Sequence, residues 1–177
     1  MKKHKVKNLL RVKKTATKRQ RIAVFFLLAI LIVAVDQISK FWAEANLDST
    51  SVPVIGELLQ FRLAYNNAAA FSIGLGATWI LTLISLTASI LLVWYGPRVK
   101  TMSWAVAAGF ALGGAVGNLI DRAFKPPQFL NGWVVDFIQI PFNFPIFNLA
   151  DTFLATAVIL SVALTLRGDE IGGGRAK

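Results

Sequence analysis

Two long stretches without charge are the feature that most constrains this chain. Residues 63–97 and 101–120 contain no Lys, Arg, Asp or Glu, over 35 and 20 positions. A helix of about 20 apolar residues crosses the core of a bilayer. The composition agrees, because 55% of the 177 residues are hydrophobic, against about 45–50% in soluble domains. The sequence therefore predicts a membrane protein.

Four membrane-spanning helices are expected. They cover about residues 22–42, 73–95, 102–120 and 147–166. A cleavable signal peptide is the alternative for residues 1–35, but its apolar run is short and no clear small-residue cleavage site precedes Asp36. We therefore favour a first span that stays in the protein.

Lysine and arginine set the expected orientation. Residues 1–21 hold ten Lys or Arg and no acid. Such a segment is typical of a nucleic-acid arm or of a cytoplasmic anchor, and we favour the anchor because a span follows at once. Arg98, Lys100 and Arg167 fall on the same side. Both termini are thus expected in the cytoplasm.

This topology divides the chain into a core and two tails. The expected parts are a basic tail at 1–21, a four-helix domain at 22–167 with outer loops at about 43–72 and 121–146, and a C-terminal tail at 168–177. In the first outer loop, LLQFRLAYN partly alternates as a short strand does, and FWAEANLDST is either a helix end or an interfacial helix. Four prolines predict irregular backbone with at most short strands in the second loop.

The residue types that are missing narrow the chemistry. The chain has no Cys, and its single histidine, His4, lies in the basic tail. A Ser–His or Cys–His pair and an HExxH zinc helix are therefore excluded from the domain. We expect neither a metal nor a cofactor, and nothing indicates a nucleic-acid ligand or an obligate protein partner.

Polar residues of separate segments are predicted at one level, near the outer surface. The expected spans bring together Asp36, Asp121, Asp136 and Asp151, with Asn66, Asn118 and Asn148. Ionisable groups at membrane depth usually face the bundle interior or water, and they often mark function.

Each acid also has a structural interpretation. Asp36 and Lys40 are four residues apart on one helix and can pair, and Asp121 can pair with Arg122 at a helix end. Asp151 can serve the N-terminus of the fourth helix. Asp136 has no cation close in sequence, so Arg122 or Lys125 would have to be its buried partner.

A pair of carboxylates offers another answer for Asp136 and Asp151. Two neighbouring carboxylates cannot both ionise cheaply, so they share a proton. The charged one can then activate water while the protonated one polarises a carbonyl. This is the chemistry of aspartic proteases, and it requires no His, Cys or metal.

Five short segments follow one another between residues 36 and 151. They are DQISKFW, NNAAAF, GGAVGNLIDR, VVDFI and FNLAD. In this order they resemble the D-Q-x-x-K, N-x-G-A-A-F, G-G-A-x-G-N-x-x-D-R and two aspartate boxes of the lipoprotein signal peptidases, also called signal peptidase II. Five boxes in order are far more specific than any one of them.

The resemblance implies an all-α fold of four transmembrane helices with a small extracytoplasmic β-cradle and an interfacial helix. It implies an aspartic endopeptidase of the bacterial inner membrane that removes signal peptides from prolipoproteins, cutting just before a diacylglyceryl cysteine. The active site would lie near the outer surface, among membrane lipids. The implied roles are catalysis for Asp136 and Asp151, substrate contact for Asn66, Asn118, Arg122 and Asn148, and structural support for Asp36, Lys40, Gly114 and Asp121.

Two departures from the family pattern stand out. Ala68 occupies the position where the family usually has Gly, and residues 122–136 form a longer segment than usual, with a Pro-Pro pair. Two other classes of protein remain open from the residues alone. They are a proton-coupled carrier, although carriers place such groups near the midplane, and a membrane scaffold whose acids only pair with cations.

Overall fold

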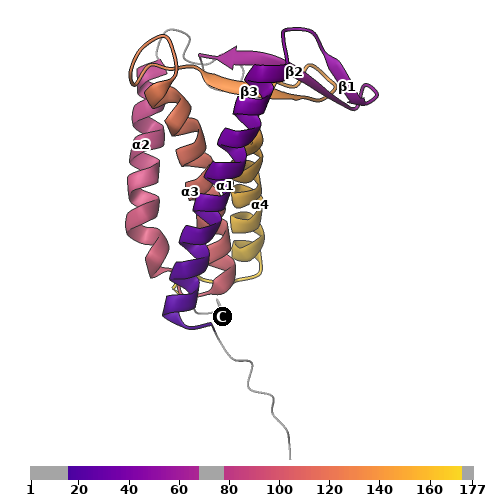
Figure 1. Cartoon of the computed structure of the whole chain (residues 1–177). Coiled ribbons are helices and arrows are strands. Elements are labelled where there is room, and N and C mark those ends of the chain that lie inside the picture. The colour runs from indigo at the N-terminus through magenta and orange to yellow at the C-terminus, as the bar shows by residue number, and fades with distance from the viewer. Residues whose placement is uncertain (1–15, 68–77, 173–177) are drawn as a thin grey trace, which may run out of the picture.

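The computed structural model describes residues 16–67 and 78–172. Figure 1 shows a bundle of helices with a small sheet lying across one end. The elements in chain order are α1 Lys18–Asn46, β1 Val52–Ile55, β2 Leu59–Asn66, α2 Thr78–Tyr95, the short 3-10 helix η2 Gly96–Arg98, α3 Met102–Phe124, β3 Val134–Gln139 and α4 Leu149–Leu166.

The prediction of four spans is confirmed, because each of these four α-helices is long and apolar enough to cross a membrane. The first extends beyond the predicted 22–42 at both ends, so FWAEAN is the end of α1 and not a separate helix. The predicted start of the second span, at 73–77, lies outside the described residues, as does Ala68. The separate interfacial helix stays a prediction.

Helix α3 is the centre of the bundle, and the other three helices pack against it. Small residues allow the close approach. A Cβ added at Gly113 would lie 2.6 Å from the Cβ of Ile32 on α1. One added at Gly114 would lie 2.5 Å from the carbonyl oxygen of Ala150 on α4. The sequence GGAVG therefore fixes how near α1 and α4 come to α3.

The sheet is antiparallel in the order β1–β2–β3. Strand β2 confirms the short strand predicted for LLQFRLAYN, although the burial of its side chains does not alternate strictly. Strand β3 is the one strand of the second outer loop within the described residues. Asp136 on β3 stands opposite Ala64 on β2, two positions before Asn66. Pairing with β2 thus brings residues of the two outer loops together over the bundle.

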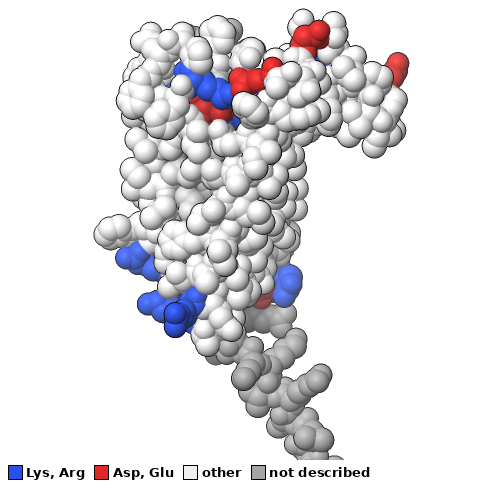
Figure 2. Space-filling model, viewed as in Figure 1, with Lys and Arg blue, Asp and Glu red and all other residues white. Residues whose placement is uncertain are grey.

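The two ends of the bundle differ in charge. We call the end that carries β1–β3 the sheet end, and the end formed by the start of α1, η2 and residues 167–172 the basic end. Figure 2 shows Lys and Arg gathered at the basic end, a broad uncharged belt over the helices, and charges again beneath the sheet. The basic end is tied together by bonds from Arg21 Nε to the Val99 oxygen, at 3.2 Å, and from the Lys100 nitrogen to the Ile171 oxygen, at 3.1 Å.

Candidate functional site

The four acids predicted at one level all lie at the sheet end. Asp36 and Asp121 come from α1 and α3, Asp136 from β3 and Asp151 from α4. The side chains of Asp36, Asp121 and Asp136 are at most 1% exposed, and Asp151 is half-buried. The chain therefore places four carboxylates in or beside an apolar bundle, where each needs bonds that replace water.

The four acids form two pairs, Asp36 with Asp121 and Asp136 with Asp151. Lys40 provides the counter-charge for the first pair. Its ammonium is buried and lies 2.8 Å from Oδ2 of Asp36 and 2.9 Å from Oδ2 of Asp121. It also donates to Oδ1 of Asn118, at 3.0 Å. An ammonium has three donors, and all three are used. The predicted Asp36–Lys40 pair is confirmed, and Lys40 is the ion-pair partner that the structure gives to Asp121.

The same two aspartates hold the backbone beside the other pair. Oδ1 of Asp36 accepts from the nitrogen of Ala150, at 2.9 Å, and Oδ2 of Asp121 accepts from the nitrogen of Val135, at 3.1 Å. Ala150 directly precedes Asp151, and Val135 directly precedes Asp136. The group around Lys40 thus fixes the backbone at both candidate catalytic residues.

Gln37 joins this group, and the sequence reasoning did not single it out. Its Nε2 donates to Oδ2 of Asp36, to Oδ1 of Asp121 and to the carbonyl of Gly117, at 3.1–3.2 Å. The signal was present, because Gln37 is the second residue of the DQISKFW segment. We refer to Asp36, Gln37, Lys40 and Asp121 as the Lys40 cluster.

Asn148 is the residue that connects Asp136 with Asp151. It is the N-cap of α4. Its side-chain oxygen accepts a hydrogen bond from the backbone nitrogen of Asp151, and the Asp151 carboxylate accepts one from the backbone nitrogen of Asn148. Its Nδ2 donates to Oδ1 of Asp136, at 2.6 Å. The helix-start position predicted for Asp151 is confirmed. Because one side chain bonds to both residues, the two carboxylates share one small site.

Two more amides complete the set. Nδ2 of Asn66 donates to Oδ2 of Asp136, at 2.8 Å. Nδ2 of Asn118 donates to Oδ1 of Asp151, also at 2.8 Å, while its Oδ1 accepts from Asn148 and from Lys40. Asn118 therefore joins the Lys40 cluster to what we call the Asn148 site, made of Asn66, Asn118, Asp136, Asn148 and Asp151.

The Asn148 site favours a protonated Asp136. Burial raises the pKa of this carboxyl to about 7, and the charge of Asp151 acts in the same direction. The hydrogen bonds from the side-chain amides of Asn66 and Asn148, and the charge of Lys40, oppose this rise in pKa. One carboxyl that keeps its proton beside another is the condition under which such a pair can work as acid and base.

Arg122 and Lys125 were the cations proposed to pair with Asp136. Arg122 is buried at the end of α3 and feels the charges of Asp136, Asp151 and Asp121. Lys125 instead forms an ion pair with Glu44 of α1, and both side chains are partly exposed. Burial raises the pKa of the Tyr65 hydroxyl on β2, and the nearby Glu44 raises it further. No motif in the sequence predicts this link between α1 and the end of α3.

No group of three acidic or histidine side chains in the described ranges could hold a metal ion. The four acids are each engaged with amides, with backbone N–H groups or with Lys40. What this arrangement offers to a reaction is a pair of carboxyl groups and the polar side chains around them.

Comparison with known proteins identifies the relatives of this chain. A family model described as "Signal peptidase (SPase) II" matches residues 28–167. A lipoprotein signal peptidase of Leifsonia xyli is 41% identical over 157 residues, which cover 88% of this chain and 73% of that protein. One of Rhodococcus jostii is 40% identical over 157 residues, covering 88% and 79%.

Two solved structures share the fold. Both are described as bacterial membrane enzymes determined by the in meso method, at 2.3 Å and 1.9 Å resolution. The first has a TM-score of 0.74 and 30% identity, and covers 88% of this chain and 95% of that one. The second has a TM-score of 0.72 and 32% identity, and covers 82% and 94%.

Proposed function

Because the chain belongs to the signal peptidase II family, a family of proteases, we propose that it is an aspartic endopeptidase with Asp136 and Asp151 as its catalytic pair. Its substrates are prolipoproteins, from which it removes the signal peptide. The observation that carries the proposal is the bonding of both carboxylates to one residue, Asn148. Four membrane-span candidates fit a multi-pass membrane protein.

The reaction would use water as the nucleophile. Asp151 is ionised and takes a proton from the water, while the protonated Asp136 donates a hydrogen bond to the scissile carbonyl. This assignment follows the high pKa of Asp136 and the place of Asp151 in the first turn of α4, where the helix dipole favours negative charge. The two macroscopic titration steps belong to the pair as a whole.

Substrate contact is proposed for Asn66, Asn118, Arg122 and Asn148. In this structure the three amides orient the two carboxylates, with donor–acceptor distances of 2.6–2.8 Å for three of their bonds. A peptide that enters the site would bond to the remaining polar atoms of these side chains. Arg122, buried beside the pair, supplies positive charge where the tetrahedral oxygen develops.

We place the chain in the bacterial inner membrane with both termini in the cytoplasm. The gathering of Lys and Arg at the basic end supports this orientation. The sheet end, and with it the Asn148 site, then lies near the outer surface. The scissile bond precedes a diacylglyceryl cysteine, whose acyl chains stay in the lipid and hold the cysteine at the depth of the aspartates.

Exposed apolar side chains around the sheet suit such a substrate. Ile55 at the end of β1 and Leu58 after it are 60% and 70% exposed, and Phe142 and Phe144 after β3 are 99% and 50% exposed. We propose that they contact lipid or the substrate's acyl chains and restrict the access of bulk water. Cleavage would then depend on lipidation through positioning.

The test replaces each candidate catalytic residue by its neutral isostere. We expect Asp136→Asn and Asp151→Asn to lower the cleavage of a lipidated prolipoprotein by at least about 10²–10⁴-fold, the usual contribution of acid–base catalysis. Both variants should still fold, as shown by thermal unfolding in detergent. The control Asp169→Asn removes an acid at the basic end, where Asp169 pairs with Arg167, and should cleave normally.

Two results would count against the proposal. Cleavage that survives in both Asn variants would exclude the carboxyl pair as the catalytic group. Variants that fail to fold, while their folded fraction keeps full activity, would favour a scaffold. The same substrate without diacylglycerol tests the positioning argument separately, because equal cleavage of both forms would refute it even with the pair confirmed.

A further inference from the structure

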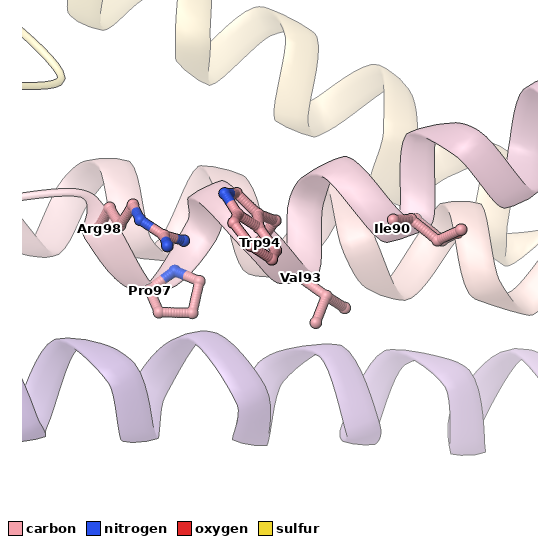
Figure 3. Close-up of a pocket in the computed structure, with 6 residues that line it drawn as sticks. Ile90, Val93, Trp94, Pro97 and Arg98 are labelled. Carbon is pink, nitrogen blue, oxygen red and sulfur yellow. The ribbon is translucent and has the colours of Figure 1, made fainter.

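Two hollows open at the basic end, at the opposite end of the bundle from the Asn148 site. The first has a volume of about 410 Å³ and is lined by Ser89, Ile90, Val93, Trp94, Pro97 and Arg98. Figure 3 labels five of these side chains, from Ile90 to Arg98. The second, of about 320 Å³, is bounded by residues of α2, α3 and α4 and by residues 171–172. Such volumes are those of sites for small ligands. Nothing in the proposed cleavage reaction uses either of them.

The hollows lie on opposite sides of α2. The first is lined by Ile90, Val93 and Trp94, and the second by Leu92, Tyr95 and Gly96. The second set follows the first at a displacement of two residues, which is about 200° around an α-helix. The end of α2 therefore separates two largely apolar hollows.

One residue, Arg98, lines both. Its side chain is exposed, and its guanidinium carbon lies 4.9 Å from the centre of the Trp94 ring and 6.0 Å from that of Tyr95. Figure 3 shows the guanidinium beside Trp94 and Pro97. Within the described residues, 16–67 and 78–172, no acid forms an ion pair with Arg98. Its charge is thus available at the point where the two hollows meet.

The second hollow has a wall that is held in place. The Lys100 nitrogen donates to the Ile171 oxygen at 3.1 Å, and Nε1 of Trp104 donates to the Asp169 oxygen at 2.9 Å. The Asp169 carboxylate pairs with Arg167, so this acid has a partner of its own. These bonds fold residues 169–172 back against the start of α3.

We propose that the end of α2 binds one anionic phospholipid, with its phosphate at Arg98 and one acyl chain in each hollow. A phospholipid combines one anionic headgroup with two apolar chains, and this site combines one cation with two apolar hollows. Trp94 and Tyr95 are the residue types that lie at headgroup level in membranes, and basic pockets between helices are typical binding places for anionic headgroups.

Other occupants fit less well. A soluble phosphate would use Arg98 but neither hollow, and a neutral lipid would use the hollows but not the charge. The prolipoprotein does not account for the site either, because its cysteine is held at the sheet end in the proposed function. The lipid site is therefore independent of the cleavage reaction, and a failure of one would leave the other standing.

The experiment uses the full chain in lipid nanodiscs of phosphatidylcholine with a minor share of phosphatidylglycerol. In matched samples, one of the two lipids carries a photoactivatable group in its acyl chain, and the cross-linked residues are located by mass spectrometry. We expect several-fold more cross-linking by phosphatidylglycerol than by phosphatidylcholine, at residues 89–98 and at the α3 wall of the second hollow.

Two matched pairs of variants separate a site from general attraction. Arg98→Gln should reduce phosphatidylglycerol cross-linking to the level of phosphatidylcholine, whereas Arg19→Gln, which removes an exposed Arg from α1 at the same end, should not. Ile90→Trp fills the first hollow and should lower cross-linking there. Ile84→Trp changes an equally exposed residue of α2 outside both hollows, since Ile84 is 59% and Ile90 57% exposed, and should have no effect.

Three results would overturn the proposal. They are equal cross-linking by the two lipids in the unchanged protein, an equal loss in Arg98→Gln and Arg19→Gln, and an equal effect of the two Trp variants. The first would remove the preference for an anionic headgroup. The second would reduce the effect to surface charge, and the third would remove the role of the hollow.

Discussion

Two pairs of aspartates share the sheet end of this bundle, but different groups hold them. Asp36 and Asp121 meet the buried ammonium of Lys40 at 2.8 and 2.9 Å. Asp136 and Asp151 are instead held by the amides of asparagines, with Asn148 bonded to both. The first pair has a counter-charge in direct contact, whereas the ionisation of the second depends on burial and on the charges nearby.

The difference assigns separate tasks to four residues of one type. The Lys40 cluster holds the backbone nitrogens of Ala150 and Val135, and so positions the two residues that follow them. The Asn148 site leaves one carboxyl, Asp136, able to keep its proton at neutral pH. A cation in the second pair would suit stability, but it would remove the acid that the proposed reaction needs.

The largest effect is expected from Lys40→Met. This change leaves two buried carboxylates without their counter-charge, and breaking a buried pair costs about 3–5 kcal/mol. We expect a large drop in thermal stability in detergent, together with loss of cleavage. The matched control is Lys125→Met, which breaks the partly exposed pair with Glu44 and should cost at most about 1 kcal/mol. Equal losses in the two variants would contradict the special role of the Lys40 cluster.

A smaller effect on stability, but a clear one on catalysis, is expected from Asn148→Ala. Loss of an N-cap costs about 1 kcal/mol, and a misplaced catalytic group can cost about 10²-fold in rate. Thr101→Ala is the control, because Thr101 caps α3 at the basic end. It should lose similar stability and keep its rate. If both variants cleave equally well, Asn148 is only a helix cap.

Gly114→Ala should have the smallest effect of the three on the rate of cleavage. The added methyl would meet the Ala150 oxygen at 2.5 Å and Cγ of Leu154 at 2.7 Å. Such overpacking costs about 1–3 kcal/mol, partly offset by the better helix propensity of Ala. We expect a modest drop in unfolding temperature and slower cleavage, because the start of α4 carries Asp151. Gly172→Ala has no atom within 4 Å of its new methyl and should change neither quantity.

The sequence predicted the local features of this site better than the hydrogen bonds and ion pairs between its distant segments. Charge-free runs predicted the four spans, and the i, i+4 spacing predicted the Asp36–Lys40 pair. The place of Asp151 at the start of the fourth span also predicted that it serves the N-terminus of that helix. These are local features, so one segment is enough to find them.

The connections that matter most cross long distances in the sequence. The bond from Ala150 to Asp36 spans 114 positions, and the bond from Gln37 to Asp121 spans 84. The direct ion-pair partner of Asp121 that the structure shows is Lys40 of α1, 81 positions away, where the sequence suggested the adjacent Arg122. Lys125 likewise pairs with Glu44 and not with Asp136. Only the packing of α1 against α3 and α4 brings these residues together.

The central claim is that Asp136 and Asp151 work as a pair holding one proton, with the proton on Asp136. The direct test is the pH dependence of kcat/KM for cleavage of a lipidated prolipoprotein. Because burial raises the pKa of Asp136 to about 7, the active form is present below that pH and is lost above it. We predict a rate that falls tenfold per pH unit above about 7 and also falls in acid, as the second carboxyl takes up a proton. A rate that rises through pH 7 and stays level in alkali would contradict the account.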